Sequence, residues 1–264
     1  MATLAADQSV TGAREERLFL HLALGMAAVI FAGFSLQLAM GRSTFASPPL
    51  VHAHALVFMG WVVLFVLQTT FATTGRMGLH RLLGWLATGW MVAMLVLGTA
   101  VVVAVVRRGQ VPFFFRPQQF LVFDPVSLVT FAGLTTAAIA LRRRTDWHRR
   151  LHICGTAMLL GPGFGRLLPL PLLVPFAWEA TLAASLIVPV IGMAVDRRRS
   201  GQIHPAWARG IGAMVLCLVV VEAVTYSPVG AAIYRWVAAG SPGAAVAPLA
   251  FPPKPAGRLR TGRT

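Results

Sequence analysis

The stretch LFLHLALGMAAVIFAGFSLQLAMG at positions 18–41 contains no Lys, Arg, Asp or Glu, although Arg17 and Arg42 border it directly. A helix needs about 20 apolar residues to cross the roughly 30 Å hydrocarbon layer of a membrane, because it rises about 1.5 Å per residue. These 24 residues are therefore long enough to span a bilayer. They also exceed the roughly 7 to 15 apolar residues of a signal-peptide core, so we expect the stretch to remain as the first span.

Comparable apolar stretches recur along the chain of 264 residues, of which 57% are hydrophobic and 12% charged. Soluble domains carry about 25% charged residues, so lipid is the expected environment of most side chains. The stretches predict an all-α polytopic transmembrane helix bundle of about seven spans. We expect these at 18–40, 50–73, 83–106, 119–141, 151–169, 172–195 and 209–227.

These predicted spans divide the chain into three segments. Residues 1–17 form a polar amino terminus, residues 18–230 the bundle, and residues 231–264 a basic tail rich in Pro and Gly, which we expect to be disordered. Within the bundle, the fifth span contains GPGFG at 161–165 and LPLPL at 168–172. Pro cannot donate to the helical ladder, so we expect a kink or a re-entrant turn there.

The formal charge of +15 comes mainly from Arg residues in the short connections between apolar stretches. With seven spans, 13 Arg residues fall on the side of the amino terminus and five in the opposite loops, while the tail adds five more basic residues on that opposite side. Because cytoplasmic loops carry the excess of positive charge, we expect the protein in the cell inner membrane with a cytoplasmic amino terminus. The basic residues are not interleaved with stacking aromatics, so the expected partner is the lipid bilayer rather than nucleic acid.

Several functional classes lack their sequence signatures. No GxxxxGK or HExxH motif is present, which disfavours an ATP-driven pump and a zinc-dependent intramembrane protease. The two cysteines, Cys154 and Cys217, lie in different apolar stretches and form no CxxC motif, so a disulfide framework is not indicated. The absence of CxxCH also argues against covalently attached c-type haem.

The histidines separate by side of the membrane. His148 and His152 are four residues apart, so on a helix they share one face and could bind one metal ion together. Alternatively, they contact lipid phosphate or transfer protons. His80 begins the third span at the same expected level, so imidazoles from two helices could meet at the inner face. On the outer side, His52 and His54 could serve one site only if the chain is extended there, because residues i and i+2 of a helix point apart.

Two acidic residues lie within predicted spans, Glu179 in the outer part of the sixth and Glu222 in the seventh. Intramembrane carboxylates are costly, face the bundle interior and mark proton or ion paths or buried ion pairs. Arg166, at the outer end of the fifth span, is the expected partner of Glu179. Glu222 has no such partner in the sequence, which makes it the better candidate for a proton or ion path.

The motifs VHAHALVFMGWVVLFVLQTTF, GRMGLHRLLGW and DWHRRLHICGTAMLLGPGFGR resemble those of a group of bacterial multi-span membrane proteins to which no activity is attached. This resemblance covers roughly residues 18–195. The chain is also similar, more weakly, to haem-bearing membrane proteins of the cytochrome b561 type and to proteins of cytochrome oxidase assembly. That likeness implies haem b held by histidines near helix ends, with His54, His80, His148 and His152 as candidate ligands. Unlike in the b561 type, both outer histidines come from one helix.

Three functions are thus open. The first is a bundle that binds haem b or a divalent metal for membrane redox chemistry or cofactor handling, with a redox or assembly partner. The second is a small-solute or ion permease that uses Glu179, Glu222 and the break at GPGFG. The third is a non-catalytic assembly factor. Whether the protein is an enzyme is not decided by its sequence.

Overall fold

The computed structural model describes the backbone of residues 2–254 and the side chains of residues 17–254. Six of its helices are long and apolar enough to cross a membrane. They are α1 (Ala2–Ala39), α2 (Pro49–Thr73), α3 (Met77–Arg107), α4 (Pro117–Ala140), α7 (Ala177–Ser200) and α8 (Pro205–Thr225). The described residues form helices and no strands, so the predicted all-α membrane bundle is confirmed.

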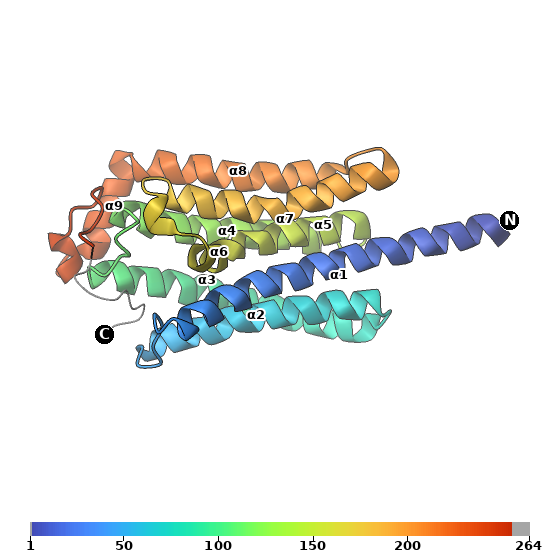
Figure 1. The fold of residues 1–264 in the computed structure, drawn as a ribbon, viewed down its shortest axis with the longest axis horizontal. Helices are drawn as coiled ribbons and strands as arrows, with labels where there is room; N and C mark the ends of the chain where they lie inside the picture. Colours follow the sequence, from blue (N-terminus) through green and yellow to red (C-terminus); the bar gives the residue numbers. More distant parts are fainter. Residues whose placement is uncertain (1, 255–264) are drawn as a thin grey trace.

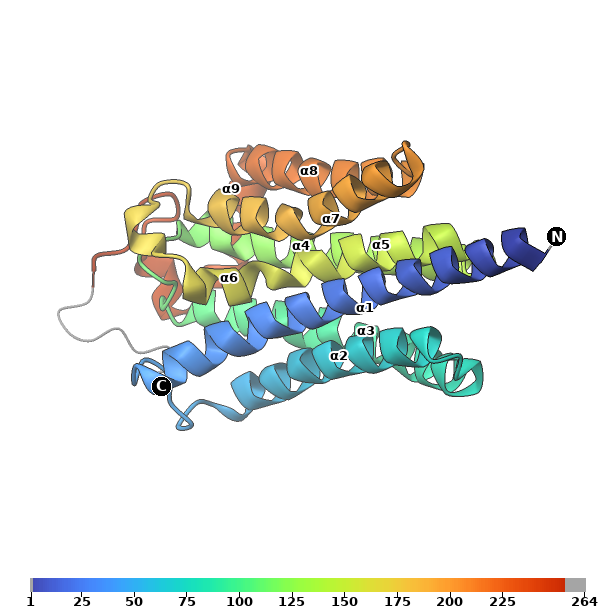
Figure 2. The same cartoon turned by 45° about the vertical axis from the view of Figure 1, so that its right-hand side comes forward.

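The remaining predicted span, 151–169, is divided into short pieces. Helix α5 (Thr145–Ala157) continues through the 3₁₀ turn η1 (Met158–Leu160) into α6 (Gly161–Leu167). Figures 1 and 2 show α5 and α6 following one another along the long axis of the bundle beside α1. The break comes just before Pro162, whose missing N–H interrupts the helical ladder. A seventh passage through the bundle is therefore made by two helices instead of one.

The connections gather at two ends of the molecule (Figure 1). The turns α2–α3, α4–α5 and α7–α8 lie at the end that also carries the amino terminus. These turns, the helix ends beside them and the amino-terminal segment together contain 13 of the 22 arginines. We call this the basic end. The other connections lie at the opposite end together with the last described residues, and we call this the tail end. The seven passages thus leave the two termini at opposite ends.

Helix α4 lies at the centre of the bundle and contacts α3, α5 and α8. Its side chains line the core, where Phe131 and Ala138 are completely buried. The outward faces of the spans remain apolar and uncovered, as at Leu56 of α2, Val96 of α3 and Val129 of α4. Exposed apolar side chains around the whole perimeter are expected when the surrounding solvent is lipid. The fold therefore supports a bilayer environment for these helices.

The expected disorder from residue 231 onward is wrong for residues 231–254. Helix α9 (Pro228–Ala238) and the 3₁₀ turn η3 (Pro242–Ala245) pack across the tail end of the bundle. Arg107 Nη1 donates to the carbonyl of Val237 at 2.7 Å, and the Tyr234 hydroxyl donates to the carbonyl of Gly243 at 3.1 Å. These tertiary bonds order a segment whose composition alone suggests a flexible tail. The remainder of the predicted tail, 255–264, lies outside the described residues.

Candidate functional site

Three histidines from two helices meet near the basic end. The ring centroids of His80, in the first turn of α3, and His148, in α5, lie 6.2 Å apart, with ring planes 81° to one another. His152 lies one turn further along α5, with its ring centroid 4.6 Å from that of His148. The sequence placed these residues at one level, and the tertiary structure brings their imidazoles together. We call them the basic-end histidines.

Two of these rings are fixed by backbone carbonyls. His80 Nδ1 lies 3.1 Å from the carbonyl oxygen of Gln68, and His148 Nδ1 lies 2.8 Å from that of Ala138. A carbonyl oxygen only accepts, so each Nδ1 must carry the hydrogen of its neutral ring. The lone pair is then on Nε2 of both residues. Histidines that ligate metals commonly donate their other N–H to a carbonyl in this way, which orients the ring.

The same arrangement limits the kind of cofactor that fits. Among residues 17–254, no three His, Cys, Asp or Glu side chains are grouped so that they could hold a metal ion. A protein zinc site uses three or four such ligands, whereas the predicted pair His148 and His152 supplies two. A haem brings four equatorial nitrogens of its own and needs only axial ligands from the protein. Two histidines are thus fewer than the ligands of a protein zinc site and equal in number to the axial ligands that a haem can take from a protein.

The two acidic residues of the predicted ion path come together at the tail end. Gln119 of α4, which is only 1% exposed, donates from Nε2 to Glu222 Oε1 at 3.0 Å and to Glu179 Oε1 at 3.3 Å. The indole N–H of Trp178 donates to the same Glu222 oxygen at 3.1 Å. One neutral amide thus bridges two carboxylates from α7 and α8. The sequence did not identify Gln119 or Trp178 as site residues. Both are neutral, so placing either one in an apolar helix costs far less than placing a charged side chain there.

Tyr226 lies beside the bridged carboxylates, in the connection between α8 and α9. Arg116 Nη1 donates to its hydroxyl at 2.8 Å. Burial raises the pKa of the Tyr226 phenol, and the two neighbouring glutamates raise it further against the opposite effect of Arg116. Tyr226 is therefore a neutral hydrogen-bonding group at this end of the bundle.

The expected pairing of Arg166 with Glu179 is wrong. Arg166, in the last turn of α6, lies over the ring of Phe34 of α1, with its guanidinium carbon 3.8 Å from the ring centroid. The guanidinium of Arg166 interacts electrostatically with Asp124 of α4 and with His54 of α2. Helix α6 packs against α1, which directs the guanidinium to that side of the bundle. We call His54, Asp124 and Arg166 the tail-end trio.

His52 and His54 do not form one site. Helix α2 begins at Pro49, so both residues are already helical and point apart. His52 Nε2 lies 3.1 Å from the carbonyl oxygen of Phe45 in the preceding loop. His54 stacks on Phe58 at 4.2 Å between ring centroids and interacts electrostatically with Arg166. Of the four predicted cofactor ligands, His54 is thus separated from His80, His148 and His152, which lie together near the other end of the bundle.

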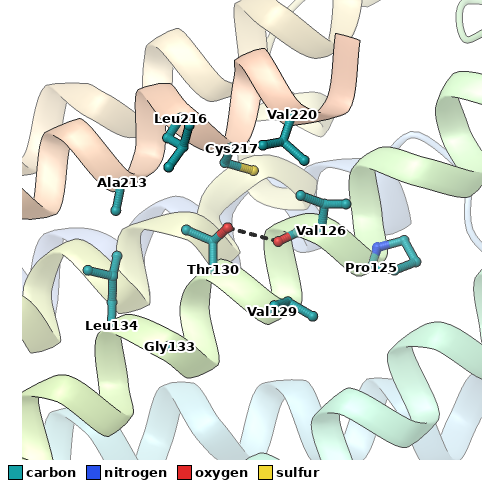
Figure 3. A pocket seen from close by; sticks show the side chains of 10 residues that line it. All are labelled: Pro125, Val126, Val129, Thr130, Gly133, Leu134, Ala213, Leu216, Cys217 and Val220. Atoms are coloured by element: carbon teal, nitrogen blue, oxygen red, sulfur yellow. Dashed lines mark hydrogen bonds between the residues drawn. The ribbon is translucent and has the colours of Figure 1, made fainter. Parts of the chain in front are cut away.

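A groove of about 520 Å³ runs between α4 and α8 (Figure 3). Its walls are nearly all apolar, and they include Val126, Val129, Leu216 and Val220. The hydroxyl of Thr130 donates to the carbonyl of Val126 in its own helix, at 2.9 Å, so its one hydrogen is already used. The groove is far poorer in polar groups than the histidine and carboxylate clusters. Comparisons of the chain with protein-family models, with curated proteins and with solved structures find no match.

Proposed function

We propose that the protein is a haem b membrane protein whose iron is held by His80 and His148, and that it serves membrane redox chemistry or cofactor handling. The observation that carries the proposal is the pair of imidazoles from two helices, with each Nδ1 bound to a carbonyl and each Nε2 left for a ligand. Bound there, haem b would supply one-electron transfer.

The spacing of the rings supports this pair. Imidazoles from two helices could hold one haem iron between them only if their rings lie close to each other. The centroids of His80 and His148 are 6.2 Å apart. His148 and His152 are a poorer pair, because both project from the same face of α5 and cannot approach a flat macrocycle from both sides. His152 is then a neighbour of the ligands and contributes to the environment of His148.

The visible spectrum of the purified protein tests the proposal. We expect a Soret band and a reduced b-type spectrum, both lost in His80→Ala and in His148→Ala. His21→Ala is the matched control, because His21 is an exposed histidine of α1 toward the same end, and it should keep both features. Protein from haem-replete cells that contains neither haem nor stoichiometric metal would reject the proposal.

The alternative is an ion or small-solute permease that uses the carboxylates at the tail end. Its support is the amide of Gln119, which holds Glu179 and Glu222 close enough for their charges to interact. Two neighbouring carboxylates favour a shared proton or a bound cation. Under this alternative, Glu222→Gln would abolish transport, whereas the haem proposal gives this substitution no effect on the spectrum.

A further inference from the structure

Three helices turn one face each toward a common line through the bundle. On α2, His54, Trp61 and Gln68 are seven residues apart and thus lie two turns from one another on one face. On α4, Asp124 and Thr135 are eleven residues apart, which is three turns. On the broken passage α5–α6, the corresponding face carries His152, Thr156 and Arg166. We call this line the polar axis.

Contacts between the helices join these faces at successive depths. Near the basic end, His152 of α5 lies by Phe65 of α2, with ring centroids 6.5 Å apart. Nearer the middle, Trp61 of α2 packs on Phe131 of α4 at 4.9 Å. Thr135 Oγ1 lies 3.0 Å from the position that a Cβ on Gly155 would take, so α4 and α5 are in close contact there. The tail-end trio ends the axis at one side and the basic-end histidines end it at the other.

Seven buried polar atoms on this axis have no hydrogen-bond partner among residues 17–254. They are Nδ1 of His54, Nε1 of Trp61, Oε1 of Gln68, Oγ1 of Thr135, Nδ1 of His152, Oγ1 of Thr156 and Nε of Arg166. Trp61, Thr135 and Thr156 are 3%, 1% and 4% exposed, so bulk solvent does not supply the missing bonds. A buried polar group without a partner destabilises a fold, and buried water is its usual partner.

We propose that the polar axis binds a file of water molecules that extends from the tail-end trio to the end of the axis beside the basic-end histidines. Water suits this set of atoms because it both donates and accepts. The indole N–H of Trp61 requires an acceptor, the Gln68 oxygen requires a donor, and the hydroxyls of Thr135 and Thr156 accept either. Polar side chains on neighbouring spans, next to a discontinuous helix, are typical of water-filled paths inside membrane proteins.

Hydrogen exchange at Trp61 tests the file at its midpoint. In detergent-solubilised full-length protein transferred to D₂O, we expect its indole N–H to exchange at least about tenfold faster than that of Trp207. Trp207 is the internal control, because it is 0% exposed and its N–H is bonded to Asp196 at 2.7 Å. Trp61→Phe assigns the signal. Exchange at Trp61 as slow as at Trp207 would overturn the proposal.

Interrupting the file tests its continuity. Thr135→Val removes one hydroxyl with little change of shape and should slow exchange at Trp61 about tenfold, since the water beside it loses a partner. Thr130→Val is the matched control on the same helix, because Thr130 lines the groove between α4 and α8 and its hydroxyl donates to the carbonyl of Val126. If Thr135→Val does not fold, Thr156→Val serves the same purpose. Equal exchange in these variants and in the wild type would also overturn the proposal, and neither result depends on bound haem.

Discussion

At the scale of single residues, the buried carboxylate of Asp196 at the basic end joins three helices. Arg150 of α5 and Asp196 of α7 are 5% and 6% exposed, and Arg150 Nε donates to Asp196 Oδ2 at 2.8 Å. The indole of Trp207 of α8 donates to the same oxygen at 2.7 Å. A buried charge is stable only when paired and hydrogen-bonded. Asp196 is thus the residue that ties α5, α7 and α8 together.

Asp196→Ala removes the carboxylate to which both the buried Arg150 guanidinium and the Trp207 indole donate. We expect the free energy of unfolding to fall by about 3 to 5 kcal/mol, the usual cost of breaking a buried pair from one side. Thermal unfolding in detergent, followed by tryptophan fluorescence, measures the change. Arg197→Ala is the control, because Arg197 is the exposed neighbour in α7 and should change stability by less than about 0.5 kcal/mol. Equal melting of the two variants would contradict this role of Asp196.

At the scale of elements, the broken passage α5–α6 is held against α1 by two glycines. A Cβ on Gly33 would lie 2.5 Å from the carbonyl oxygen of Gly163 and 3.2 Å from its Cα. Small residues let two helix backbones approach this closely in a membrane, where apolar side chains gain nothing by leaving lipid. The position of α6, and with it Arg166 over Phe34, depends on this contact.

Gly33→Ala should therefore push α6 away from α1 and lower the free energy of unfolding by about 1 to 3 kcal/mol, as overpacking does. Gly25→Ala is the matched control in the same helix, because a Cβ there has no atom within 4 Å. That control should be neutral or stabilising by up to about 1 kcal/mol, since Ala favours helix over Gly. Comparing the two melting temperatures checks the prediction, and a Gly33→Ala protein as stable as Gly25→Ala would contradict it.

At the scale of the whole molecule, seven passages place the amino terminus and helix α9 at opposite ends (Figure 1). A reporter fused after Lys254 should thus lie across the membrane from one fused at the amino terminus. The excess of arginine predicts that the basic end is cytoplasmic. A cytoplasmic reporter should accordingly be active after Arg144 and inactive after Gln110. Activity of a periplasmic reporter after Arg144 would reverse the orientation, and both termini on one side would contradict seven passages.

The sequence alone determined the membrane helices, because a span needs only a sufficient run of apolar residues and every such run is local. The helix ends were predicted less accurately than the helices themselves. The third span was expected to begin near residue 83, but α3 begins at Met77 and includes His80 and Arg81. The common level of His80, His148 and His152 was also predictable from the order of spans. These features depend on residues that are close together in the chain, so they can be predicted from the sequence.

Only the tertiary structure decided which side chains meet. Arg166 interacts electrostatically with Asp124 instead of pairing with Glu179. The packing of α6 on α1 fixes the direction of this long side chain, and the sequence alone does not give that direction. Gln119 was found to bridge Glu179 and Glu222 only when three helices were placed side by side. The order of the tail likewise arises from bonds such as Arg107 to Val237, 130 positions apart. Contacts at such separations depend on helix rotation and packing, which hydropathy does not encode.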